Sequence, residues 1–173
     1  MAQNTLQIRP AEPQDSATIL TFIKELAEYE KLAHEVLATE ALVRKALFGS
    51  RPAAEVLIAE QSGEPVGFAL FFPTFSTFLA KAGIYLEDLY VREAARGQGI
   101  GVALMSAVAQ VAVERGAGRF EWSVLNWNTP SIEFYASLGA KPLSEWTMQR
   151  ITGSALKALA ERGAPSADST RET

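Results

Sequence analysis

A glycine-rich segment near the middle of the chain has the residue types that bind phosphate through main-chain amides. It stands between an apolar stretch that ends at Val91 and an alanine- and valine-rich stretch from Val102 to Arg115. Its residues are Arg96, Gly97, Gln98, Gly99, Ile100 and Gly101. Glycine lets a backbone approach a ligand closely, and the first amides of a helix are unpaired and attract anions. A strand, this turn and a helix in succession therefore predict a phosphate or pyrophosphate site.

The spacing of the glycines excludes two common nucleotide-binding motifs. A P-loop requires Lys and then Ser or Thr after its last glycine, but Val102 and Ala103 follow Gly101. A Rossmann fingerprint has glycines at relative positions 1, 3 and 6, whereas here they stand at positions 1, 3 and 5. The phosphate site must be of another kind.

Two adjacent carboxylates, Glu87 and Asp88, precede this segment. Because neighbouring residues of a strand face opposite sides, one of the two must face inward or line a cleft. The chain has no cysteine and a single histidine, His34, which excludes Cys nucleophiles, Cys-based zinc sites and multi-His metal sites. The net charge of −4 is unlike that of a general nucleic-acid binder.

Apolar periodicity predicts the elements that position these residues. We expect strands over residues 6–9, 56–60, 66–72, 84–91, 119–125 and 146–151, and helices over 16–27, 39–47, 102–115, 129–138 and 154–161. The chain of 173 residues predicts one domain of the mixed α/β class, over residues 1–162, with residues 163–173 as a disordered tail. It shows no signal-peptide pattern and no long apolar run, so we expect no membrane span and a cytoplasmic location.

The glycine-rich segment resembles the acetyl-CoA motif of the GNAT acetyltransferases, Arg/Gln-x-x-Gly-x-Gly/Ala, at Arg96, Gly99 and Gly101. Other segments are similar to one branch of that family, the diamine (spermidine/spermine) and thialysine acetyltransferases. They are residues 26–30, 66–69, 85–91, 126–131 and 134–140. The resemblance covers about residues 6–151 and implies the GNAT fold, in which helices flank a mixed central sheet.

The resemblance also implies residue roles. Tyr135 matches the general acid, and Glu87 matches a glutamate that accepts the amine proton directly or through water. Residues at the substrate amine would be Tyr29, Glu30, Glu87 and Glu145. Residues at the cofactor would be Leu89, Tyr90, Val91, Arg96, Gly97, Gln98, Gly99, Ile100, Gly101, Asn128, Pro130 and Ser131. No metal is implied.

The chemistry agrees with these roles. An alkyl amine has a pKa near 10 and reaches the site protonated, so a carboxylate must first take a proton from it. The sequence thus predicts acetyl transfer from acetyl-CoA, by direct attack, to the primary amine of a polyamine or a thialysine-like amino acid. A protein lysine or N-terminal acetyltransferase and a non-catalytic acetyl-CoA-binding regulatory domain are the alternatives.

The expected partners are a small amine and a second copy of the chain, with no nucleic acid or membrane. Related enzymes are commonly homodimers, and Phe75, Phe78 and Trp146 are aromatic residues in segments expected to be exposed. Apolar patches of that kind often mark interfaces, and a two-fold dimer is the commonest soluble oligomer.

Overall fold

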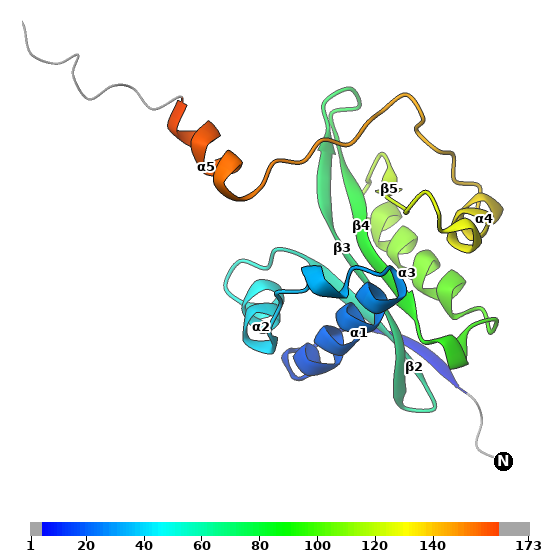
Figure 1. The fold of residues 1–173 in the computed structure, drawn as a ribbon. Helices are drawn as coiled ribbons and strands as arrows, with labels where there is room; N and C mark the ends of the chain where they lie inside the picture. The colour runs from blue at the N-terminus through cyan, green and yellow to red at the C-terminus, as the bar shows by residue number, and fades with distance from the viewer. Residues whose placement is uncertain (1–4, 163–173) are drawn as a thin grey trace, which may run out of the picture. The chain divides into compact units, whose positions relative to one another are not determined.

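The computed structural model describes residues 5–162 (Figure 1). The chain divides into two compact units, residues 1–128 and residues 129–173. The tail predicted at residues 163–173 lies outside the described residues.

A five-stranded mixed sheet forms the centre of the first unit. Its strands lie in sequence order: β1 (Leu6–Pro10), β2 (Glu55–Gln61), β3 (Glu64–Ser76), β4 (Lys81–Val91) and β5 (Phe120–Trp122). The first four pair antiparallel, and β5 pairs parallel with β4. This arrangement confirms the predicted mixed α/β class.

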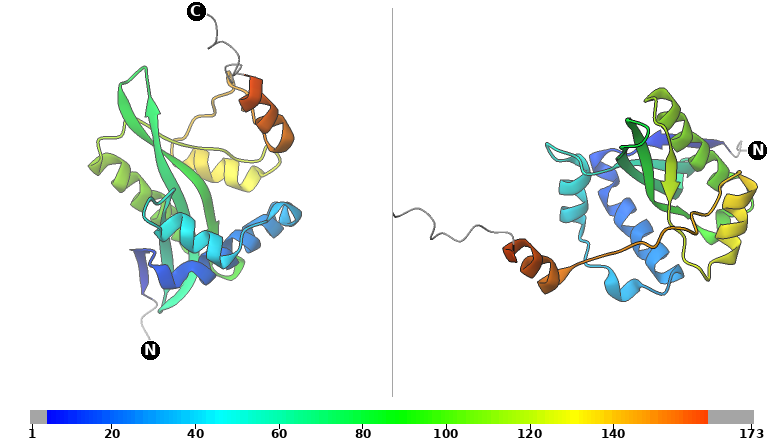
Figure 2. Two further views of the ribbon diagram at one scale, coloured as in Figure 1. Left: turned by 90° about the vertical axis from the view of Figure 1, so that its left-hand side faces the viewer. Right: turned by 90° about the horizontal axis from the view of Figure 1, so that it is seen from above.

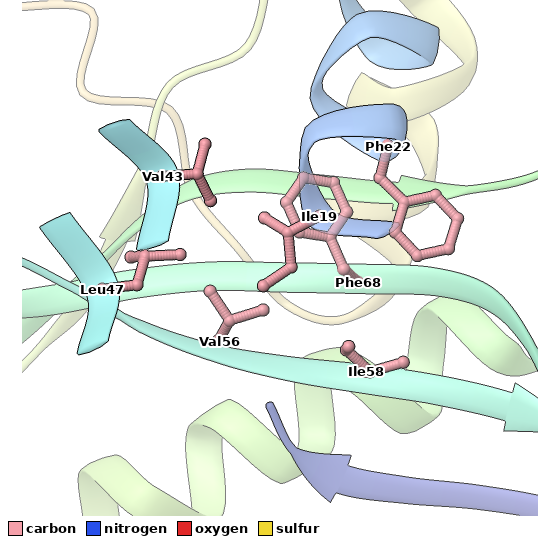
Figure 3. Close-up of a cluster of buried hydrophobic side chains, with 7 residues drawn as sticks. All are labelled: Ile19, Phe22, Val43, Leu47, Val56, Ile58 and Phe68. Atoms are coloured by element: carbon pink, nitrogen blue, oxygen red, sulfur yellow. The ribbon is translucent and has the colours of Figure 1, made fainter. Parts of the chain in front are cut away.

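Helices cover both faces of this sheet (Figure 2). They are α1 (Ser16–Tyr29), α2 (Glu40–Phe48) and α3 (Ile100–Glu114), with short 3₁₀ turns η1 (Pro13–Asp15), η2 (Ala33–Glu35) and η3 (Glu93–Ala95). The face under α1 and α2 is held by one apolar cluster (Figure 3), formed by Ile19, Phe22, Val43, Leu47, Val56, Ile58 and Phe68. The intervening strand residues Leu57 and Ala59 are buried on the opposite face, under α3. Successive side chains of a strand point to opposite faces of the sheet, so β2 contributes apolar residues to the core on both faces.

Three strands, β3, β4 and β5, differ in length from the prediction. The segment 75–78, expected in a connection, partly extends the β3–β4 hairpin, where Phe75 pairs with Ala82 and Ser76 with Lys81. The predicted strand 119–125 is shorter, because pairing with β4 ends at Trp122.

The second unit contains α4 (Thr129–Ser137) and α5 (Gly153–Arg162), which confirms both helices predicted there. The strand predicted over residues 146–151 is wrong, since residues 138–152 form neither helix nor strand. A strand requires a hydrogen-bonded neighbour, and the described part of this unit contains no other strand. Over residues 5–162, none of the helices is long and apolar enough to cross a membrane.

Candidate active site

Strand β4 parts from β5 halfway along its length. Their pairing runs only from Ile84 to Leu86, so from Glu87 to Val91 the sheet places β3 on one side of β4 and no described strand on the other. Main-chain N–H and C=O groups are obligatory hydrogen-bonding groups. This open edge of β4, residues 87–91, is therefore suited to an extended ligand that carries amide groups of its own.

A β-bulge lies where the open edge begins. Leu86 pairs with Phe71 and Asp88 pairs with Leu70, so Glu87 has no residue opposite it in β3. A bulge interrupts the alternation of a strand and re-aims its side chains. The expectation that Glu87 and Asp88 face opposite sides therefore does not apply at this point.

Three carboxylates interact at the bulge, those of Glu30, Glu87 and Asp88. Asp88 pairs with Leu70, which packs against the cluster under α1 and α2. Burial, and then the charges of Glu87 and Glu30, raise the pKa of Asp88 to about 7. Burial also raises the pKa of Glu30, whereas Glu87 is exposed. The sequence assigned no role to Asp88, although it did indicate that one member of this pair would face inward or line a cleft.

The glycine-rich turn has the conformation that close ligand approach requires. Gly97 and Gly99 have φ values of 75° and 79°, and nothing lies within 4 Å of the place where a Cβ would stand at either residue. Gly99 is the N-cap of α3, and its carbonyl accepts the N–H of Ala103 at 3.0 Å. The amides that precede Ala103 in the first turn of α3 have no carbonyl within the helix to bond. An anion such as a pyrophosphate fits there.

The side chains of this turn hold it against neighbouring strands. The Gln98 side chain accepts a hydrogen bond from Gln61 of β2 at 2.7 Å. Arg96 donates from Nε to the Val91 carbonyl at 2.9 Å, and its guanidinium lies over the rings of Tyr29, at 4.9 Å, and Tyr90, at 5.8 Å. The turn is thus fixed to the open edge of β4.

The end of α1 places Tyr29 and Glu30 at this site. Lys31 takes a left-handed conformation with φ 63° and donates its N–H to the Glu28 carbonyl, while Leu32 N–H bonds the Ala27 carbonyl. These are the two bonds of a Schellman motif, whose left-handed position is usually glycine. The helix predicted over residues 16–27 thus extends two residues further, to Tyr29, and ends there although Lys and not glycine takes the left-handed position.

Tyr29 connects this helix end to the turn after β5. Its hydroxyl donates to Oδ1 of the buried Asn128 at 3.1 Å, and its ring lies 6.1 Å from that of Trp127. Lys31 Nζ lies 5.5 Å over the Trp127 ring. The predicted substrate residue Tyr29 therefore contacts two predicted cofactor residues, Arg96 and Asn128.

Four of the predicted residues belong to the second unit. Pro130, Ser131 and Tyr135 lie in α4, and Glu145 lies in the irregular stretch between α4 and α5. Near the end of α4 the Tyr135 carbonyl accepts the N–H groups of Leu138 and Ala140, each at 3.1 Å. The group that the structure brings together consists of first-unit residues: the end of α1, the open edge, the turn and Asn128. Across residues 5–162, no three His, Cys, Asp or Glu side chains form a possible metal site.

Comparison with known sequences points to one family. The model of the acetyltransferase (GNAT) family matches residues 21–140. The chain is 41% identical to the thialysine N-epsilon-acetyltransferase of Sus scrofa, over 88% of this chain and 96% of that protein. It is 35% identical to an L-ornithine N5-acetyltransferase of Arabidopsis thaliana, over 88% of this chain and 87% of that protein.

A solved structure has a similar fold. An integron cassette protein from the mobile metagenome of V. cholerae matches with a TM-score of 0.76 and 25% sequence identity, over 93% of this chain and 99% of that one. The part of the chain that the family model matches, residues 21–140, includes every first-unit residue described above at the open edge and in the glycine-rich turn.

Proposed function

Because the chain belongs to the GNAT family of acetyltransferases, we propose that this acetyl-CoA-dependent N-acetyltransferase acts on the side-chain primary amine of a small cationic amino acid. One observation carries the proposal: the carboxylates of Glu87 and Asp88 stand at the bulge where the open edge of β4 begins, within the electrostatic influence of Glu30. The named activities of two relatives, on thialysine and on ornithine, support the choice of an amino acid that bears a terminal amine.

Acetyl-CoA is the acetyl donor of this family, and the residues of the first unit suit it. The glycine-rich turn and the start of α3 offer main-chain N–H groups and open space for its pyrophosphate. The open edge, with Leu89 to Val91, offers main-chain groups to its amide-bearing arm. Asn128, Pro130 and Ser131 are the further contacts that we assign to it.

The three carboxylates suit a cationic amine. Like charges at short range raise one another's pKa, and an opposite charge nearby favours the ionised forms. The pKa of Asp88 is raised to about 7, first by burial and then by the charges of Glu87 and Glu30, and an ammonium group at the bulge would offset that repulsion between carboxylates. We assign amine contacts to Glu30 and Glu87, and to Glu145 of the second unit.

Two residues of this chain move protons in the proposed reaction. Glu87 takes one proton from the ammonium group, and the free amine then attacks the thioester carbonyl carbon, forming the C–N bond. The C–S bond breaks with its electron pair on sulfur, and Tyr135 donates its hydroxyl proton to that sulfur. The second amine proton replaces the one that Tyr135 gave. Each transfer is general acid–base catalysis by a side chain suited to it.

The substrate is tested with a panel of amines, with thiol release as the readout. We expect thialysine, ornithine and lysine to be acetylated at the side-chain nitrogen with a higher kcat/KM than spermidine, spermine or a lysine-containing peptide. Mass spectrometry of the products locates the acetyl group. A higher kcat/KM for the polyamines would contradict the amino-acid substrate and identify the chain as a polyamine acetyltransferase. A higher kcat/KM for the peptide would identify it as a protein acetyltransferase.

The proton carriers are tested by pH–rate profiles of Glu87→Gln and Tyr135→Phe with the best amine of the panel. Tyr135→Phe should lower kcat by roughly 10²- to 10⁴-fold at every pH, because the leaving sulfur lacks its donor. Glu87→Gln should be most impaired at neutral pH and partly recover towards pH 10, where free amine becomes abundant.

Asp88→Asn belongs in the same experiment, because Asp88 becomes charged only as the pH rises through about 7. If the kcat of Asp88→Asn recovered at high pH while the kcat of Glu87→Gln stayed equally low at every pH, the proton acceptor would be Asp88 and not Glu87. Near wild-type kcat in Tyr135→Phe would refute the assigned acid.

A homodimer is the proposed assembly. Phe75 and Phe78, two neighbouring aromatic side chains at the end of the β3–β4 hairpin, are 63% and 94% exposed, and grouped exposed apolar side chains often mark interfaces. Light scattering should give a mass of twice the 18.7 kDa of one chain. Phe78→Ser should weaken the dimer if the hairpin forms the interface, and a wild-type monomer would contradict the proposal.

A further inference from the structure

Four side chains form a cation–aromatic ladder across the site, in the order Arg96, Tyr29, Trp127 and Lys31. The guanidinium lies 4.9 Å from the Tyr29 ring, the two rings lie 6.1 Å apart, and the ammonium lies 5.5 Å from the Trp127 ring. The ladder starts in the glycine-rich turn, crosses the end of α1 and reaches the turn after β5. It links segments that are far apart in the sequence.

Tyr29 is the residue that joins the two turns. Its ring contacts Arg96, the first residue of the glycine-rich turn, and its hydroxyl donates to the buried Asn128. Arg96 and Asn128 are both residues that we assign to acetyl-CoA. Without Tyr29, Arg96 would keep its contacts with the Tyr90 ring and the Val91 carbonyl. Asn128 would lose the hydrogen bond that the Tyr29 hydroxyl donates to it at 3.1 Å.

The charges around Tyr29 are unfavourable for an amine. Both ends of the ladder are cations, and a ring face occupied by a guanidinium is not open to an ammonium group. Positive charges at this place attract the phosphates of coenzyme A and repel a cationic acceptor. Glu30, the next residue, interacts instead with Asp88 at the bulge. Two successive residues at the end of α1 therefore interact with different parts of the site, Tyr29 with Arg96 and Asn128, and Glu30 with Asp88.

We infer that Tyr29 is a positioning residue for acetyl-CoA, which holds Arg96 and Asn128 in their binding arrangement, and that it does not bind the amine. This inference rests on the proposed function and revises the role that the family resemblance implies for Tyr29. The predicted signature is a loss of coenzyme A affinity without a matching change in the KM of the amine.

The test measures the Kd of coenzyme A by calorimetry, and the KM of the amine, for Tyr29→Phe and Tyr29→Leu. Tyr29→Phe keeps the ring over Arg96 and removes the bond to Asn128, so the Kd should rise about threefold. Tyr29→Leu removes both contacts and should raise the Kd about tenfold or more. In both variants the KM of the amine, at saturating acetyl-CoA, should stay within about twofold of wild type.

A matched control is Tyr85→Phe, which removes another tyrosine hydroxyl from the first unit. That hydroxyl lies 2.7 Å from Ser123 Oγ, outside the ladder. Tyr85→Phe should leave the Kd of coenzyme A unchanged. A double-mutant cycle between Tyr29→Leu and Arg96→Lys should be non-additive in that Kd, because Lys lacks the planar group that stacks on the ring.

The outcomes separate the inference from the function on which it rests. A raised KM of the amine with an unchanged Kd of coenzyme A in the Tyr29 variants would overturn the inference and show that Tyr29 binds the amine. Equal losses of both affinities, with a lowered melting temperature, would show a merely structural role and also overturn it. A wild-type chain that binds no coenzyme A would overturn the proposed function itself.

Discussion

An open strand edge in the middle of a sheet leaves main-chain hydrogen-bonding groups without a neighbouring strand, and β4 has such an edge from Glu87 to Val91. The rest of the site follows from it. The bulge at Glu87 marks where the edge begins, and the turn that follows β4 begins at Arg92 and leads into α3. One strand therefore places the carboxylates at one end of the open edge and the phosphate-binding glycines just beyond the other.

The end of α1 divides the site chemically. A left-handed Lys31 ends the helix. Tyr29 contacts Arg96 and Asn128, while the charge of the next residue, Glu30, acts on Asp88 at the bulge. Cations thus gather where an anionic cofactor is proposed, and anions gather where a cationic amine is proposed. This separation of charge lets one short helix end serve two substrates of opposite charge.

The sequence predicts those features that depend on local residue types. Glycine spacing located the turn, and apolar periodicity located the three helices and five strands of the first unit, with β3, β4 and β5 differing in length from the prediction. Features that depend on pairing were missed. No residue pattern reveals the bulge at Glu87, next to Asp88. The first helix, predicted over residues 16–27, extends two residues further, to Tyr29. The strand predicted at 146–151 failed because apolar alternation alone does not supply a neighbouring strand.

The central claim is that the turn before α3 holds acetyl-CoA, and calorimetry on two matched variants tests it most directly. Gly99 and Gly116 both have left-handed backbones, at φ 79° and 65°, with open space at the Cβ position, but they lie at opposite ends of α3. Aspartate tolerates that conformation and adds the same charge at each. Gly99→Asp should abolish acetyl-CoA binding, since it puts an anion where the pyrophosphate is expected, and Gly116→Asp should leave binding intact. Equal binding by the two variants would contradict the account.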